Sequence, residues 1–294
     1  MWQDYQYPET ANQAVTLLAE WSGQARIVAG GTDLVLQLKR GERQADCLVD
    51  VSRVEEMRRI EEADGVITVG SAVTHAEIAA SPLIQAVAPV LAQAAAEVGS
   101  PEIRNVATIG GNVVNAQPAA DTALALLALE AEAEVVGSAG SRWVPLLDLY
   151  VKAGVSAIDS TAQIVRAFRF KLPAGRVGSA YRRLGKCKSI ALPVLCAATI
   201  VRLEEDQISS AAISLGPVAP VPFRARAAER WLAGQPASPG TLEQAAAMAQ
   251  EEAQPRDSLL RCAREYREAM VGVLVQSTLE RAVTAAKAAP GGAS

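Results

Sequence analysis

The sequence lacks residues that several common classes of active site require. It contains one histidine, His75, so a site with several histidine ligands is impossible, and a Ser-His-Asp or Cys-His mechanism would have to use that single residue. Because His75 follows Thr74, a common helix-cap residue, we expect it at the start of a helix. The cysteines are widely scattered, with no C-x-x-C pair, and predict reduced, buried thiols rather than a cluster or metal site. These cysteines are Cys47, Cys187, Cys196 and Cys262.

Long apolar runs and an excess of basic residues are also missing. The longest apolar run, from Ile190 to Val201, is interrupted by Pro193 and is too short to cross about 30 Å of hydrocarbon. The N-terminus shows no basic segment followed by an apolar stretch, so we predict no signal peptide and a cytoplasmic location. The formal net charge of −4, from 28 Lys+Arg against 32 Asp+Glu, argues against a nucleic-acid-binding surface. With 294 residues, 50% of them hydrophobic, the chain can form two domains or three small ones.

The usual nucleotide-binding signatures are absent as well. No Gly-x-Gly occurs, which excludes the Rossmann fingerprint. The pair Gly185-Lys186 is not a P-loop, because Ala180 stands where the first glycine should be and Cys187 where Ser or Thr should be. A dinucleotide, if bound, must be held by another scheme.

Two glycine pairs occur in similar settings. In each, apolar residues suited to a strand run into Gly-Gly and then a small polar residue, in Ile27-Val28-Ala29-Gly30-Gly31-Thr32-Asp33-Leu34 and in Ala107-Thr108-Ile109-Gly110-Gly111-Asn112. Glycine tolerates positive φ and allows a ligand to approach the backbone, and successive N–H groups in such a turn can hold an anion. An isolated pair is most often only a turn. Two pairs together favour a ligand with two phosphates, such as a dinucleotide.

The pattern of elements predicts an α+β protein. Thr10 and Gln13 form a capping box for a first helix; a strand from Arg26 to Ala29 precedes a helix from Asp33 to Lys39, and a strand from Cys47 to Val51 follows. A second unit reaches the boundary predicted at Pro173-Ala174-Gly175. It includes a helix from Pro118 to Ala131 and an alternating strand from Ile164 to Phe170. Beyond it we expect strands at Val194 to Leu203 and Ile208 to Leu215, then helices at Ala225 to Leu232, Leu242 to Glu252 and Tyr266 to Lys287.

The two glycine motifs resemble the FAD-binding loops of the molybdenum hydroxylase family. More narrowly, the chain resembles the separate medium, or flavoprotein, subunit of xanthine dehydrogenase and carbon monoxide dehydrogenase over nearly its whole length. The stretches Gly216 to Ala225 and Pro255-Arg256-Asp257-Ser258, with Tyr266-Arg267, resemble the C-terminal domain of that subunit. The resemblance implies a two-subdomain FAD-binding domain over residues 1–175, with subdomains of about 1–55 and 56–175, and a smaller C-terminal α+β domain over 176–290.

The resemblance also implies which residues bind FAD. The first loop would surround the pyrophosphate through its backbone N–H groups, and the second would approach the pyrophosphate and ribityl region from the other side. Asp121 matches a family acid that binds the cofactor, and Val165 an apolar position beside the flavin, although an early-helix acid and a core residue explain them equally well. Arg183 stands where many relatives carry Lys, and Ser189 where they often have Asp. The implied cofactor-binding set is Ile27, Val28, Ala29, Gly30, Gly31, Thr32, Asp33, Leu34, Thr108, Ile109, Gly110, Gly111, Asn112, Asp121, Val165 and Arg183.

The function implied by the resemblance is electron transfer within an oxidoreductase complex. A large subunit would carry the molybdenum cofactor, and a small subunit two [2Fe–2S] clusters. Electrons would pass from these clusters through FAD to a terminal acceptor such as NAD, in a dimer of heterotrimers. No side chain of this chain need act as a catalytic acid or base, and no metal ligand is expected in it. Two alternatives remain open: a self-contained flavin oxidoreductase with its own small-molecule substrate, and an interaction subunit without cofactor. The substrate of the complex stays open too.

Overall fold

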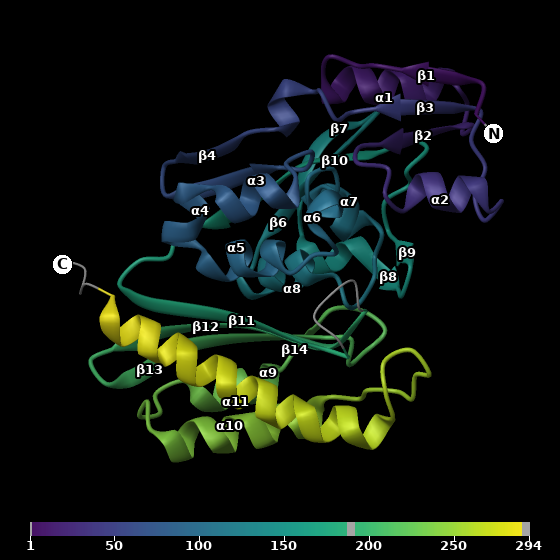
Figure 1. Cartoon of the computed structure of the whole chain (residues 1–294). Helices are drawn as coiled ribbons and strands as arrows, with labels where there is room; N and C mark the ends of the chain where they lie inside the picture. Colours follow the sequence, from purple (N-terminus) through teal and green to yellow (C-terminus); the bar gives the residue numbers. More distant parts are fainter. Residues whose placement is uncertain (1, 187–191, 290–294) are drawn as a thin grey trace. The chain divides into compact units, whose positions relative to one another are not determined.

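The computed structural model describes residues 2–186 and 192–289, and the chain divides into two compact units (Figure 1). Unit 1 comprises Met1–Ile78, Pro101–Ala116 and Glu130–Lys171. Unit 2 comprises Ala79–Ser100, Gln117–Leu129 and Leu172–Ser294. Each unit is therefore assembled from three separate stretches of the sequence.

The first sheet of unit 1 is parallel and has the strand order β1-β3-β2. Its strands are β1 (Asp4–Gln6), β2 (Ala25–Val28) and β3 (Cys47–Asp50), and its helices are α1 (Ala11–Glu20) and α2 (Leu34–Lys39). The hydroxyl of Thr10 accepts a hydrogen bond from the Gln13 N–H at 3.1 Å, which confirms the predicted cap of α1. The apolar face of α1 is buried against this sheet, and β2 leads directly into the first glycine turn.

The second sheet of unit 1 is antiparallel, in the order β4-β5-β10-β6-β7. The strands are β4 (Ile60–Ala63), β5 (Val66–Gly70), β6 (Glu132–Gly137), β7 (Gly140–Pro145) and β10 (Ile164–Lys171). Shorter elements are η1 (Glu55–Met57), η2 (Leu146–Leu149), β8 (Tyr150–Lys152), β9 (Val155–Ser156), α3 (His75–Ala80), α6 (Pro101–Arg104) and α7 (Ile109–Val114). The central strand β10 lies where a strand was predicted, but buried and exposed residues do not alternate strictly along it, and it carries a bulge between Val165 and Ala167.

Unit 2 is built on an antiparallel sheet with the order β11-β12-β13-β14. The strands are β11 (Arg176–Gly185), β12 (Pro193–Glu204), β13 (Gln207–Gly216) and β14 (Phe223–Arg224). The helices are α4 (Pro82–Val87), α5 (Pro89–Ala96), α8 (Asp121–Ala128), α9 (Arg226–Leu232), α10 (Pro239–Glu252) and α11 (Arg264–Ala288). Figure 1 shows α5 and α8 on one face of the sheet and α9, α10 and α11 on the other. All eight residues of α8 are buried, so this helix lies inside the unit.

Several sequence predictions need correction. The helix predicted from Pro118 to Ala131 is shorter, because it spans only Asp121–Ala128. Strand β11 was not predicted, since its sequence RVGSAYRRLG shows no regular alternation of apolar and polar residues. No helix among the described residues is long and apolar enough to cross a membrane.

Candidate functional site

The first glycine turn, Ala29 to Asp33, joins β2 to α2. Gly31 has φ +67°, a left-handed conformation that glycine adopts without steric cost. Within the described part of the chain, none of the five consecutive backbone N–H groups from Gly30 to Leu34 has a hydrogen-bond partner. The side chain of Asp33, which caps α2 by position, makes no capping hydrogen bond. Five free N–H donors in a turn with positive φ form the kind of backbone site that binds phosphate oxygens.

The second glycine pair does not lie in a strand-to-turn junction, so that prediction was wrong. Gly110 and Gly111 are the second and third residues of α7, which begins right after Thr108. The Thr108 hydroxyl accepts from the Gly111 N–H at 3.2 Å and caps the helix. The N–H groups of Ile109 and Gly110 donate to the carbonyls of Val73 and Ser71 at 3.0 and 2.8 Å. The N–H groups of this pair are therefore already used within the protein.

The first glycine turn and the residues just before α7 are in direct backbone contact. A Cβ atom on Gly30 would lie 1.9 Å from the Val106 carbonyl oxygen, so the first turn packs backbone to backbone against the residues that precede α7. A Cβ on Gly110 would lie 2.7 Å from the Ser71 carbonyl oxygen. In contrast, a Cβ on the exposed Gly111 would meet only the Thr108 hydroxyl, at 3.3 Å. Packing explains the missing side chains of Gly30 and Gly110, whereas Gly111 leaves an exposed surface that a ligand can approach.

Val165, on β10, is linked to the second glycine pair through Ser71. The Ser71 hydroxyl donates to the Val165 carbonyl at 2.6 Å, and the Ser71 carbonyl accepts from Gly110. The Val165 side chain is buried in unit 1. The structure thus connects this predicted residue with the Gly110 backbone through one intervening residue.

His75 is the first residue of α3, as predicted, and lies beside Ala107, just before the second glycine pair. Its backbone N–H donates to the Ala107 carbonyl at 3.1 Å, and Thr74 and Glu77 complete the cap. The imidazole is 1% exposed, and its Nδ1 has no hydrogen-bond partner among the described residues. Burial, together with the charge of Arg104, lowers the pKa of His75 to about 4, so the ring is neutral at physiological pH.

Arg26 is a residue that the sequence prediction did not include in the site. It lies on β2, the strand that leads into the first turn, and its Nε and Nη1 atoms are buried without a hydrogen-bond partner in the described chain. Burial and the nearby Arg43 lower the pKa of Arg26, and Asp159 opposes them. A basic residue within an otherwise apolar strand before the glycine pair was the available signal. Arg26 as a whole is half-buried, and its two buried guanidinium donors are suited to an anionic ligand.

Asp121 and Arg183 come together in unit 2. Asp121 is the first residue of α8 and is 6% exposed, and its Oδ1 lies 3.8 Å from Arg183 Nη1. The same oxygen accepts a hydrogen bond from the Tyr181 hydroxyl at 2.6 Å. Burial raises the pKa of the Asp121 carboxyl, and Arg183, Tyr181, its own backbone N–H and Cys196 oppose that shift. Arg183 also donates to the carbonyl of Glu97. Ser189 and Cys187 lie outside the described residues.

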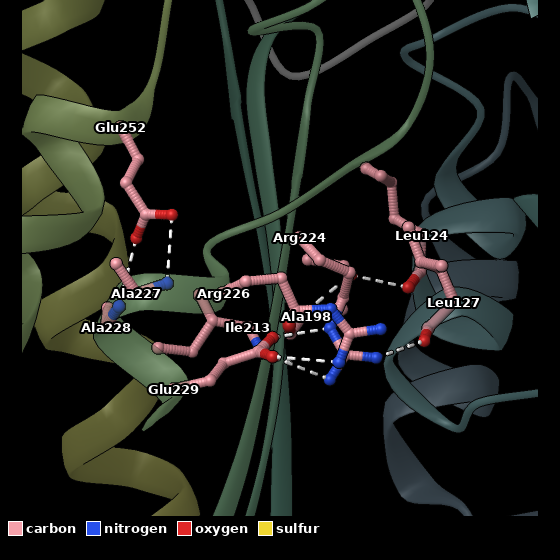
Figure 2. A network of polar contacts seen from close by, with 11 residues as sticks. Leu124, Leu127, Ala198, Ile213, Arg224, Arg226, Ala227, Ala228, Glu229 and Glu252 are labelled. Atoms are coloured by element: carbon pink, nitrogen blue, oxygen red, sulfur yellow. Dashed lines mark hydrogen bonds and ion pairs between the residues drawn. The ribbon is translucent and has the colours of Figure 1, made fainter. Parts of the chain in front are cut away.

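A buried network in unit 2 fixes the other end of α8 (Figure 2). Arg224 donates to the Leu127 carbonyl at 3.0 Å and is paired with Glu229, with Nε 2.5 Å from Oε1. The Ser214 hydroxyl donates to the Leu124 carbonyl at 2.6 Å. Leu127 lies in the last turn, whose carbonyls lack partners within the helix, and Leu124 lies in the middle, so these donors anchor the middle and the end of α8 to the sheet. Figure 2 also shows Glu252 accepting from the N–H groups of Ala227 and Ala228, at the start of α9.

The chain matches known families over most of its length. Residues 2–173 match the FAD binding domain in molybdopterin dehydrogenase, and residues 179–282 match the CO dehydrogenase flavoprotein C-terminal domain. The chain is 31% identical to the xanthine dehydrogenase FAD-binding subunit of Escherichia coli O157:H7, over 96% of each chain. It is 29% identical to the carbon monoxide dehydrogenase medium chain of Hydrogenophaga pseudoflava, over 95% of this chain and 96% of that one.

The fold is also shared with solved structures. A chain of carbon monoxide dehydrogenase from Hydrogenophaga pseudoflava, in a form lacking the Mo-pyranopterin moiety, superimposes with a TM-score of 0.91 at 28% identity, covering 97% of this chain and 98% of that one. The predicted α+β fold class, family, oxidoreductase class and FAD cofactor are thereby confirmed. The chain belongs to the family of FAD-binding subunits of molybdopterin dehydrogenases.

Proposed function

We propose that the first glycine turn holds the diphosphate of FAD through the free N–H groups of Gly30 to Leu34. That row of unpartnered donors is the observation that carries the proposal, because a diphosphate supplies the acceptor oxygens that it lacks. Gly111 would face the cofactor, since a side chain there would meet little of the protein itself. Arg26 would add positive charge near the phosphates.

The remaining predicted contacts are proposed on the family resemblance. Thr32, Asp33 and Asn112 offer polar groups next to the two glycine pairs, and Thr108 positions the second pair by capping α7. We propose Asp121, Val165 and Arg183 as further contacts of the same cofactor. The division into an FAD-binding domain of residues 1–175 and a C-terminal domain of 176–290 stays a prediction.

We propose that the chain serves as the electron-transfer subunit of a molybdenum hydroxylase complex. FAD, when bound, supplies a redox centre that exchanges electrons with one-electron and two-electron partners. The protein would bind the cofactor, orient it and set its potential through hydrogen bonds and charge, without a catalytic acid or base of its own. The proposed partners are a large molybdenum-cofactor subunit and a small subunit with two [2Fe–2S] clusters, in a cytoplasmic dimer of heterotrimers. NAD is the proposed acceptor.

The test is purification of the chain from its native host, with identification of the flavin and of the chains that accompany it. We expect one FAD per chain, released on denaturation, and co-purification with a molybdenum-containing chain and an iron–sulfur chain. The assembled complex should reduce NAD, and the isolated chain should not oxidise the substrate of the complex.

Two outcomes would contradict the proposal in different ways. A chain that never takes up flavin would remove the cofactor assignment for both glycine segments. A chain that binds FAD and turns over a small molecule by itself, without partner chains, would establish the self-contained flavin oxidoreductase instead.

A further inference from the structure

Within the described part of the chain, the Asp121 carboxylate contacts other side chains through one of its two oxygens only, and it also accepts from its own backbone N–H. Within the described residues, all three of its side-chain contacts are made at Oδ1. They are the Tyr181 hydroxyl at 2.6 Å, the Cys196 thiol at 3.7 Å and Arg183 Nη1 at 3.8 Å. Oδ2 has no side-chain partner there. A carboxylate of this kind keeps an oxygen for another donor while its orientation is fixed by the first.

The sheet register accounts for the arrangement. Tyr181 and Arg183 are two residues apart on β11 and share one face, and Cys196 on β12 pairs with Arg183. The backbone N–H of Tyr181 donates to Gln93 Oε1 at 2.8 Å, which ties this edge strand to α5. Burial and the Asp121 charge raise the pKa of Tyr181 well above its ordinary value, so its hydroxyl stays a donor.

The backbone that carries Asp121 is fixed independently. Ser214 and Arg224 donate to the carbonyls of Leu124 and Leu127, so the middle and the end of α8 are anchored to the sheet. With the helix held, the freedom left to the Asp121 side chain is rotation about its own bonds. The Tyr181 hydroxyl, at 2.6 Å, is the contact that removes it.

We propose that Tyr181 is a positioning residue for cofactor binding. By occupying Oδ1 of Asp121, with the Cys196 thiol as a weaker second donor, it directs Oδ2 to accept a hydrogen bond from one sugar hydroxyl of FAD, on the ribityl chain or on the ribose. This inference rests on the proposed function, in which Asp121 contacts the cofactor. It adds the chemical group that Asp121 recognises and the residue that orients it.

The test is a cycle of FAD dissociation constants measured on the full-length flavin-free chain. The proteins are wild type, Tyr181→Phe and the control Tyr150→Phe, and the ligands are FAD and analogues that each lack one ribityl or one ribose hydroxyl. Tyr150 is a matched control because its buried hydroxyl has no hydrogen-bond partner among the described residues. In wild type we expect one analogue to bind about tenfold more weakly than FAD, since a hydrogen bond to a charged group is lost.

The expected result for Tyr181→Phe is about tenfold weaker FAD binding together with loss of most of that hydroxyl-specific penalty. Tyr150→Phe should behave as wild type. Cys196→Ala provides a second variant if Tyr181→Phe does not fold, with an expected two- to threefold effect, roughly, because a thiol is a weak donor.

The remaining outcomes distinguish a failure of this inference from a failure of the proposed function. Uniformly weaker binding by Tyr181→Phe with an unchanged hydroxyl penalty would show a merely structural role and overturn the inference, as would wild-type behaviour of Tyr181→Phe. The absence of any hydroxyl penalty in wild type would overturn it as well. Failure of the wild-type chain to bind FAD at all would instead defeat the proposed function.

Discussion

The two glycine pairs of unit 1 share a sequence pattern but differ in what their backbones do. Around Gly31 the chain has positive φ and five N–H groups without partners in the described structure. Around Gly111 the chain is helical, and the N–H groups are taken by Thr108, Ser71 and Val73. The first pair supplies hydrogen-bond donors, and the second supplies an open surface with no side chain. The same sequence motif therefore has two different structural roles. Substitutions at the two pairs should differ in how much they change the free energy of unfolding and how much they change flavin binding.

The largest effect is expected from Gly30→Ala, which tests whether the two segments depend on each other. The new Cβ would lie 1.9 Å from the Val106 carbonyl oxygen, a backbone atom that cannot move without shifting the chain before α7. We expect a loss of about 3 kcal/mol or more in the free energy of unfolding, together with loss of FAD. Urea unfolding and flavin content measure both. Wild-type stability of this variant would show that the segments do not pack as described.

The next largest effect is a pH dependence of the free energy of unfolding that arises from His75. The pKa of His75 is about 4 when folded and about 6.5 when unfolded, so the unfolded chain takes up the proton first as the pH falls. The stabilisation that comes from the low pKa of folded His75 is therefore fully present above about pH 6.5. It is lost as the pH falls towards 4, which lowers the free energy of unfolding by about 3 kcal/mol at most. The advantage of wild type over His75→Leu in urea unfolding should shrink across this range. Parallel curves for the two proteins would contradict the prediction.

Gly31→Val should have a smaller effect on stability and a large one on FAD. A β-branched residue at φ +67° is strained, by about 1–2 kcal/mol, and its Cβ would lie 3.1 Å from Val35 Cγ2. Distortion of the turn should disperse the free N–H groups and remove the flavin. The control is Gly31→Asn, since Asn tolerates this conformation and should retain more FAD. Equal flavin content in the two variants would show that the backbone conformation of residue 31 does not matter.

Local signals made part of this fold predictable from the sequence. Thr10 before the first helix, Thr74 before His75 and the apolar residues around Phe168 are signals from neighbours in the chain, and the two caps and the strand are confirmed. Helix α7 was missed because glycines are poor helix formers and because its first N–H groups donate to the carbonyls of Ser71 and Val73, which are distant in sequence.

The site was predictable only in part, because its geometry also depends on contacts between residues that are distant in the sequence. The glycine pairs are visible in the sequence, but the free N–H groups and the contact of Gly30 with Val106 exist only in the folded chain. Tyr181 reaches Asp121 through the pairing of distant strands and a buried helix, so no local pattern marks it. The irregular order of polar and apolar residues along β11 also left that strand unpredicted.

The smallest effect on stability and the most direct test of flavin binding both come from Gly111→Val, compared with Gly240→Val. Each glycine lies in the first turn of a helix, and a Cβ meets nothing within 4 Å at Gly240 and only the Thr108 hydroxyl at Gly111. We expect both variants to unfold within about 0.5 kcal/mol of wild type. The measurement is the FAD dissociation constant of each flavin-free chain. The account predicts loss of FAD binding in Gly111→Val alone, and full flavin occupancy in that variant would contradict it.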